Sequence, residues 1–194
     1  MSSCNFITTG RQLGCKDSVS GLKNVFFIKY SDLDEANVDF DSTNTDEVEK
    51  WAPASQLSMF KYELKGANSF ETSIESSRDN GTTYFKGMLK IQLKKQDVAT
   101  HKAVKLLSFD RPRIVIQTMT NQFFLMGLAQ GSDVVGGTIS SGESMDSFNG
   151  YTLDFECEEV LPSPFLKCTT EAELKVLFNT VNDGSGDDAL IVAS

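Results

Sequence analysis

The sequence has a single histidine, His101, and only four cysteines in 194 residues. The cysteines are Cys4, Cys15, Cys157 and Cys168, and no two of them have the CxxC spacing of a zinc ligand pair. The sequence therefore predicts no Cys/His zinc site. We interpret the four thiols as reduced cytosolic cysteines rather than as disulfide partners.

Long apolar runs are also missing from the chain. No stretch approaches the ~20 apolar residues that a helix needs to cross a bilayer, so we expect no membrane span. The first residues contain no basic region followed by an apolar run, which argues against a classical secretion signal. We expect a protein that stays where it is made or is carried out whole.

Basic residues are scarce relative to acidic ones. The chain has 18 Lys and Arg against 27 Asp and Glu, which gives a formal net charge of −9. Binding to phosphates requires Lys and Arg clustered on one surface, so we predict no sequence-specific nucleic-acid binding. A pore through which DNA slides without sticking remains compatible with this charge.

Motifs that carry catalysis are absent as well. His101 falls on the polar face of an expected helix, where we interpret it as a surface residue rather than the base of a Ser/His/Asp triad. The glycine-rich tract 131–137 lacks a P-loop lysine and is typical of a bulge or turn. The acids of segment 32–41 lack EF-hand spacing. We predict no catalytic residue, no metal ligand and no cofactor, and therefore not an enzyme.

Alternation of apolar and polar residues is the main signal that is present. The segment 83–94 has the clearest alternation, and Asp79-Asn80-Gly81 before it is typical of a tight hairpin turn. Segment 122–128 shows no alternation, which indicates a strand covered on both faces. The expected strands are 22–30, 59–65, 70–77, 83–94, 113–118, 122–128, 133–135 and 151–158.

Two segments have helical patterns instead. Segment 97–108 begins at a capping aspartate, Asp97, and places an apolar stripe on one face. Its members are Ala99, Ala103, Leu106 and Leu107. Segment 171–179 follows a capping box of Thr170 and Glu173. Its apolar stripe is Leu174, Leu177 and Phe178.

This order of elements predicts one α+β domain over residues 1–194. Its main part would be an antiparallel β-sandwich or barrel with one flanking helix and a short C-terminal helix. Three segments are expected to be irregular: an N-terminal arm (1–21), an acidic loop (31–55) and a flexible tail (180–194). The acidic loop could be a solvated loop or a projecting one that meets a neighbouring subunit.

Two groups of residues are candidates for surface roles. For contacts between subunits they are the large aromatic residues Trp51, Phe26, Phe27 and Phe124, although Trp51 also suits an ordinary core. The acids Asp154, Glu156 and Glu158 share one face of an expected strand. This stripe could be a solvated outer face, the wall of an acidic channel, a cation site or a glycosidase-type pair.

The arrangement of hairpins around an inserted helix resembles the tail-tube fold of tailed phages. More locally, residues 56–166 resemble structural proteins of phages that infect gut Bacteroides-type hosts, including crAss-like phages. The features that carry this likeness are a strand–helix–strand block, the pair Gly136-Gly137, and a strand NGYTLDF (149–155) followed by acids and prolines.

The resemblance implies a virion structural protein, made in the host cytoplasm and without catalytic residues. Such subunits join their sheets into rings around a lumen that passes DNA or cargo, so the expected partners are copies of itself and other tail or neck proteins. Two alternatives stay open. One is a decoration, fibre or carbohydrate-binding module that stacks Tyr84 or Tyr151 on sugars; the other is a small hydrolase that depends on His101.

Overall fold

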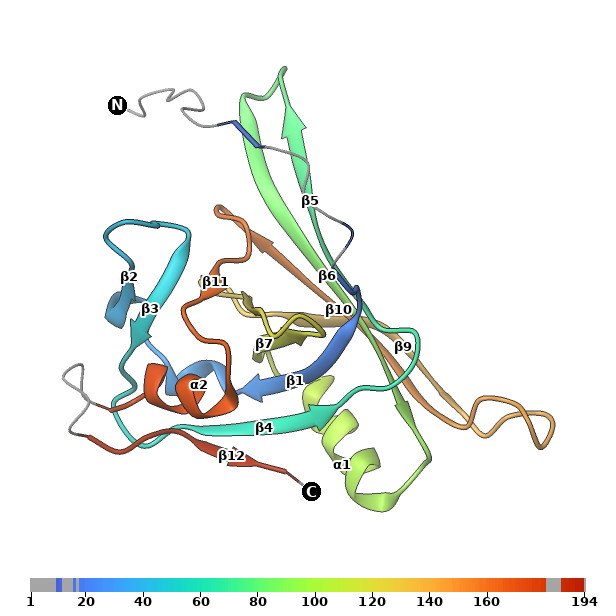
Figure 1. Cartoon of the computed structure of the whole chain (residues 1–194). Helices are drawn as coiled ribbons and strands as arrows, with labels where there is room; N and C mark the ends of the chain where they lie inside the picture. The colour runs from blue at the N-terminus through green and yellow to red at the C-terminus, as the bar shows by residue number, and fades with distance from the viewer. Residues whose placement is uncertain (1–9, 12–15, 17, 181–185, 194) are drawn as a thin grey trace.

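The computed structural model describes residues 10–11, 16, 18–180 and 186–193 of the chain. Within them the fold is α+β and mostly strand, as the sequence predicts (Figure 1). The strands are β1 (Leu22–Ile28), β2 (Val38–Phe40), β3 (Glu47–Trp51), β4 (Ser58–Glu63), β5 (Ser69–Ser77), β6 (Thr82–Lys94), β7 (Arg113–Thr118), β8 (Phe123–Met126), β9 (Asp133–Ser140), β10 (Gly150–Glu159), β11 (Phe165–Leu166) and β12 (Leu190–Val192). The helices are α1 (Val98–Leu107) and α2 (Glu171–Leu177), with short 3-10 turns at Tyr30–Asp32 and Glu35–Asn37.

The strands form two open sheets. The larger sheet has the order β12-β4-β1-β7-β8-β11-β3-β2, and the smaller one has the order β5-β6-β10-β9. The smaller sheet is antiparallel throughout. The larger sheet is mixed, because β11 runs parallel to β3 and β12 runs parallel to β4. The fold is thus mainly antiparallel, as expected, with these two parallel pairs as exceptions, and its open sheets do not form a barrel.

One hydrophobic core lies between the two sheets. Alternate residues of β6 (Leu89, Ile91, Leu93) lie beside alternate residues of the neighbouring strand β10, and together they pack against the central strands β1 and β7 of the larger sheet. The paired register of β6 and β10 puts Leu89 opposite Phe155 and Leu93 opposite Tyr151. The period-2 patterns expected for β6 and β10 are thus confirmed, since their inward-facing residues are buried or half-buried and the others face solvent. The patterns expected for segments 59–65 and 70–77 are wrong in part, because Phe60 and Ile74 are 48% and 67% exposed whereas Met59 is buried.

A second core lies on the opposite face of the larger sheet. The strands β1, β7 and β8 contribute to both cores, so they are buried on both sides, as expected for segment 122–128. Helix α2 closes this core with Leu174, Leu177 and Phe178. Its capping box is formed as predicted, since the Thr170 hydroxyl accepts a hydrogen bond from the Glu173 amide at 3.3 Å.

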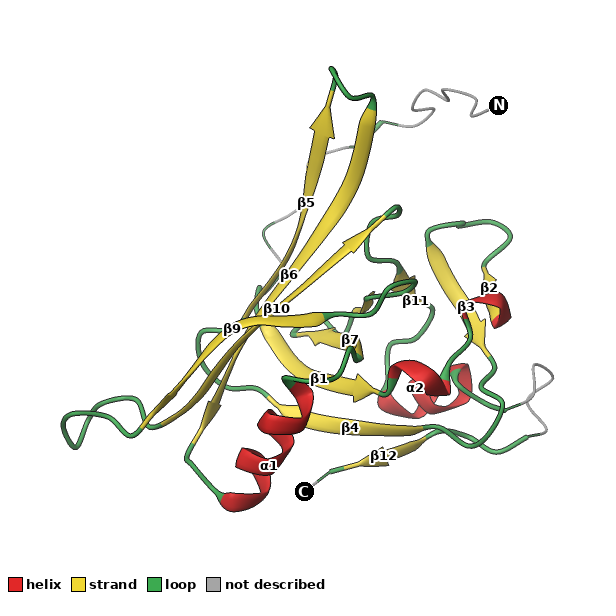
Figure 2. Cartoon of the chain, turned by 180° about the vertical axis from the view of Figure 1, so that it is seen from behind, coloured by secondary structure: helices red, strands yellow, loops and turns green. Residues whose placement is uncertain are grey.

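Helix α1 covers only part of the first core. It begins at Asp97, whose carboxylate accepts a hydrogen bond from the Thr100 amide at 2.8 Å. The residue that it buries is Val104, whereas Leu106 is 59% exposed. The predicted apolar stripe is therefore wrong at Ala99 and Leu106, which are exposed, because the helix packs beside the sheets rather than between them (Figure 2).

The segments expected to be irregular need correction. Segment 31–55 is not a loop, because it contains both 3-10 turns and the antiparallel pair β2–β3. The tail 180–194 contains β12, which extends the larger sheet beside β4. Most of the predicted arm 1–21 lies outside the described residues.

Two parts of the smaller sheet extend beyond the body of the molecule. The β5–β6 hairpin projects on one side, and the loop between β9 and β10 projects on another (Figure 1). Strand β9 is longer than the expected 133–135, and it carries the predicted bulge at Val135. In the described part of the chain, no helix has the length and apolar character to cross a membrane.

Candidate assembly surfaces

The smaller sheet ends in two edge strands, β5 and β9. Among the described residues, no strand pairs with the outer edge of either one. Natural proteins commonly protect such edges with charged residues, lysine above all, or with proline; β5 has the charged residues Glu71 and Glu75 and β9 has Asp133, and neither strand contains lysine or proline. Strand β9 also has the bulge at Val135, whose side chain is 59% exposed. Both edges are therefore suited to pairing with another strand.

The outer face of this sheet is polar and charged. Its register aligns acids from three strands and lysines from β6 on the side that faces away from the core. The acids are Glu71, Glu75, Asp133, Asp154, Glu156 and Glu158, and the lysines are Lys86, Lys90 and Lys94. All nine side chains are exposed or half-buried. Acids therefore outnumber bases on this face.

The predicted stripe of three acids lies on this outer face. Glu156 Oε1 forms an ion pair with Lys86 Nζ at 2.6 Å, and Asp154 Oδ1 lies 3.5 Å from Lys90 Nζ. The hydrogen bond from Lys86 to Glu156 raises the pKa of the lysine. The stripe is thus partly neutralised by the next strand, which the sequence analysis did not foresee. Glu158, the third member, is exposed.

The predicted interface aromatics are mostly core residues. Trp51 and Phe26 are fully buried, and Phe27 is 3% exposed. The Trp51 indole N–H donates a hydrogen bond to the Asp34 carbonyl oxygen at 2.7 Å. These three residues cannot contact a second subunit from the interior, and their assignment to an interface is wrong. Phe124 is half-buried, with its ring centre 4.5 Å from that of Phe165.

The structure also shows where the residues named for the two alternative functions lie. Tyr151 is 1% exposed, and its hydroxyl donates to the Asp97 carbonyl oxygen at 3.1 Å, so it cannot stack on a sugar. Tyr84 is 37% exposed, on the projecting hairpin. His101 is exposed on α1, with its ring 6.1 Å from that of Tyr151. Its position on the polar face of the helix is as predicted.

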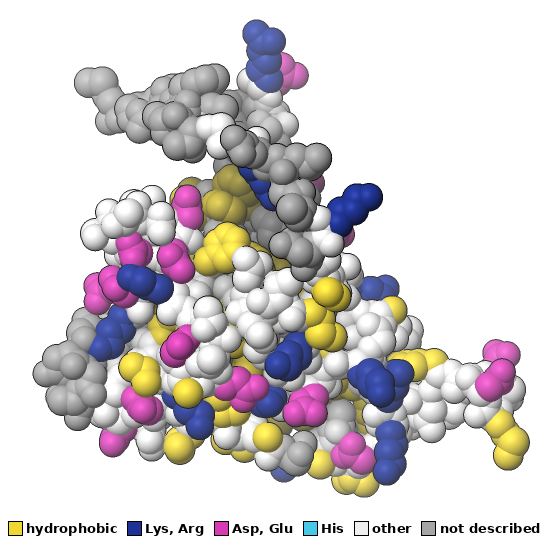
Figure 3. All heavy atoms as spheres, in the orientation of Figure 1, with side chains coloured by type: hydrophobic (Ala, Val, Ile, Leu, Met, Phe, Trp, Pro, Cys, Tyr) yellow, Lys and Arg dark blue, Asp and Glu magenta, His cyan; other side chains and the backbone are white. Residues whose placement is uncertain are grey.

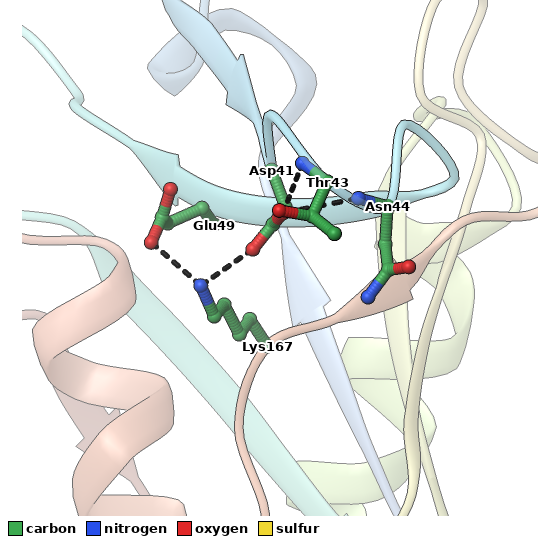
Figure 4. A network of polar contacts seen from close by, with 5 residues as sticks. All are labelled: Asp41, Thr43, Asn44, Glu49 and Lys167. Atoms are coloured by element: carbon green, nitrogen blue, oxygen red, sulfur yellow. Dashed lines mark hydrogen bonds and ion pairs between the residues drawn. The ribbon is translucent and has the colours of Figure 1, made fainter.

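The turn between β2 and β3 is fixed by a polar network around Asp41 (Figure 4). Asp41 Oδ1 accepts hydrogen bonds from the amides of Thr43 and Asn44, at 2.6 and 3.0 Å. Lys167 Nζ lies 2.5 Å from Asp41 Oδ2 and 2.7 Å from Glu49 Oε1. The Lys167 hydrogen bond is the main cause that lowers the pKa of Asp41 to about 2. We call this network the Lys167 clasp, and it holds the acidic hairpin against the segment after β11.

A hollow of about 260 Å³ lies between α1 and the ends of β1 and β4. We call it the α1 groove. Its lining is mainly apolar, and includes Phe60, Tyr62 and Leu106. Phe60 and Leu106 are 48% and 59% exposed.

The burial of three charged residues was not expected from the sequence: Asp41, which is 8% exposed in the Lys167 clasp, Arg113 and Glu159. Arg113 is 2% exposed at the start of β7, and Glu159 is 9% exposed at the end of β10. Glu159 Oε1 accepts hydrogen bonds from the amides of Ala129 and Gln130, both at 3.0 Å. Burial raises the pKa of Glu159. The one sequence signal for Arg113 is a charged residue that directly begins the apolar run Ile114–Ile116.

Two of the cysteines are free and buried. Burial raises the pKa of the Cys157 thiol to about 11 and that of Cys168 to about 12. A thiol with so high a pKa is almost entirely protonated near neutral pH and is a poor nucleophile. Cys4 and Cys15 lie outside the described residues.

Comparison of the chain with protein-family models, with curated proteins and with solved structures found no match in any of the three.

Proposed function

We propose that the chain is a structural subunit of a phage tail or neck that closes into rings around a lumen. The observation that carries this proposal is the pair of open edges, β5 and β9, at opposite ends of the smaller sheet. The β9 edge of one copy can pair with the β5 edge of the next. Such a head-to-tail contact produces a ring wherever the rotation between copies closes.

The two edges are matched in length and chemistry. Strand β9 has eight residues and strand β5 has nine, so the outward-pointing backbone groups of one could pair with those of the other along nearly the whole strand. Both are antiparallel to their inner neighbours, which leaves alternate amides and carbonyls pointing outward. The exposed apolar residues Val135, Ile139 and Ile74 lie on these edges and would gain cover in the joined sheet.

The charged outer face would line the lumen of such a ring. Six acids against three lysines give this face a net negative charge. A negatively charged lumen repels the phosphates of DNA, so DNA could pass through it without adhering. The resemblance of residues 56–166 to phage structural proteins supports a place in the virion, with assembly from subunits made in the host cytoplasm.

Light scattering over a concentration series, with negative-stain images, tests this proposal. We expect rings or tubes from the wild-type protein. The variant Val135→Lys/Ile139→Lys places charges on the β9 edge and should remain monomeric. The matched control is Val160→Lys/Leu161→Lys, which adds the same charges at residues that are 77% and 54% exposed outside the sheet edges. A wild-type monomer at every concentration, or rings from the edge variant, would refute pairing through β9.

A further inference from the structure

The α1 groove is shaped for one apolar side chain. At about 260 Å³ it lies below the ~300–1,000 Å³ of typical small-molecule sites. Its exposed walls, Phe60 and Leu106, are large and apolar. An exposed apolar hollow of this size is typical of a pocket that receives the central anchor of a protein partner.

The surroundings of the groove are basic. Lys29 is part of its lining, and α1 adds exposed Lys102 and Lys105, with exposed Arg111 just beyond the helix. Asp110 is the acid in the lining. Figure 3 shows Lys and Arg side chains interspersed with Asp and Glu side chains over the lower part of the face on which Figure 1 draws α1 and β4. A partner that fits must combine an apolar anchor with negative charge.

The acidic β2–β3 hairpin of the same chain has this combination. Phe40 lies on the edge strand β2 and is 36% exposed. Acids precede it in the chain: Asp39 is the residue before it, and Asp32, Asp34 and Glu35 are exposed in the segment of the two 3-10 turns. The Lys167 clasp fixes Asp41, the next residue, so Phe40 is presented from a rigid turn. Little conformational entropy would be lost when it binds.

A hairpin cannot reach the groove of its own chain. Strand β2 is one terminal strand of the larger sheet, and the groove lies by β4 and β1 near the other terminal strand, β12. Figures 1 and 2 show β2 and α1 on different sides of the molecule. The occupant that complements the groove is therefore a second copy of the chain.

We propose that the α1 groove binds the β2–β3 hairpin of another copy, with Phe40 as the anchor and the acids of the hairpin opposite the lysines of α1. The contact is head-to-tail, because it joins two different surfaces, and it repeats from copy to copy. This contact uses neither the β5 edge nor the β9 edge, so it does not depend on ring closure. In a ring-forming protein it would connect one ring to the next.

Complementation between two defective variants tests this contact. All proteins carry Val135→Lys/Ile139→Lys, so that pairing through β9 does not contribute to the measured mass. Phe40→Asp removes the anchor and leaves the groove intact, whereas Leu106→Asp blocks the groove and leaves the anchor. Leu106 is 59% exposed and Phe40 36%, and circular dichroism and thermal unfolding check that each variant folds. Met119→Asp, at a residue that is 48% exposed in the β7–β8 turn, is the matched control.

Sedimentation equilibrium gives the result. The parent and the Met119→Asp control should self-associate, and less so at high salt because the charges are then screened. Each defective variant alone should associate about 30-fold more weakly, as expected for the loss of a central aromatic or aliphatic anchor. A mixture of the two should form a dimer that grows no further, since one intact groove meets one intact anchor.

Two outcomes would overturn the proposal. One is a folded parent that remains monomeric at every concentration. The other is a mixture of Phe40→Asp and Leu106→Asp that forms no dimer. The ring proposal is tested separately, by imaging the wild-type protein and the variant Val135→Lys/Ile139→Lys, neither of which carries Phe40→Asp or Leu106→Asp. A dimer in the mixture would therefore support the groove contact even if no ring formed.

Discussion

The guanidinium of Arg113 lies 4.3 Å from the centre of the Tyr30 ring and also donates a hydrogen bond to the Tyr30 carbonyl oxygen at 2.7 Å. Two further bonds reach the carbonyl oxygens of Leu33 and Leu128, at 2.8 and 2.9 Å. The Trp51 ring centre lies 4.9 Å away. Burial lowers the pKa of Arg113, but an arginine this basic stays charged at neutral pH. One buried cation thus fixes the segment after β1 to the end of β8.

Replacing Arg113 with methionine should lower the free energy of unfolding by roughly 3 kcal/mol, because three buried carbonyl oxygens lose their donor. Arg113→Lys keeps the charge but lacks the planar fork of donors, so we expect a smaller loss. Urea unfolding at neutral pH measures both. Arg111→Met is the control, since Arg111 is exposed and should change stability by no more than about 0.5 kcal/mol. Equal stabilities of Arg113→Met and wild type would contradict a structural role for this network.

A second prediction concerns the close approach of β6 and β10 at Gly87. A β-carbon at this position would lie 2.8 Å from Cys157 Sγ, which is too close for an unstrained contact. We expect Gly87→Ala to lower the free energy of unfolding by about 1–3 kcal/mol. Removing the sulfur in Gly87→Ala/Cys157→Ala should restore part of this loss, so the two substitutions should couple by about 1 kcal/mol.

Gly136→Ala is the matched control for Gly87. Its β-carbon would meet its nearest atom, Asp154 Oδ2, at 3.4 Å, which is an ordinary contact. We expect a change within about 0.5 kcal/mol of wild type. Additive effects of Gly87→Ala and Cys157→Ala in urea unfolding would show that the sulfur is not the cause of the strain.

Local alternation predicts best the strands that have one buried and one solvent-exposed face. In β6 and β10 one side must be buried, so apolar and polar residues alternate along the strand. Strand β3 escaped notice because its residues Glu47, Glu49 and Lys50 dominate the composition of the segment, although Val48 and Trp51 between them are buried. Strand β12 has three residues and pairs with a strand more than a hundred positions earlier, so no local pattern could indicate it.

The surface residues show a similar division. The shared face of Asp154, Glu156 and Glu158 follows from strand geometry and was predictable. The lysines that pair with them come from another strand, whose register is set by long-range pairing. The partial neutralisation of these acids could therefore not be predicted from the local sequence. Trp51 illustrates the same limit, because an aromatic residue in a core and one in an interface have the same local sequence. Burial distinguishes them, and burial depends on the whole fold.

The last prediction concerns the Lys167 clasp and acid. The Asp41 pKa is lowered from 3.8 to about 2, first by the hydrogen bond from Lys167 and then by the amides of Asn44 and Thr43. A carboxylate with a lowered pKa stabilises the folded state fully above about 4, and this contribution disappears as the pH falls through about 2. Asp41→Asn keeps an oxygen that accepts the two amide bonds but loses the charge. We therefore expect the variant to be less stable than wild type at pH 7, and the difference in urea midpoint to shrink between pH 4 and pH 2.

In a Lys167→Gln background the same substitution should have a smaller, less pH-dependent effect, because the largest cause of the lowered Asp41 pKa is gone. A difference between wild type and Asp41→Asn that stays constant from pH 7 to pH 2 would show that the clasp does not hold the charged form of Asp41.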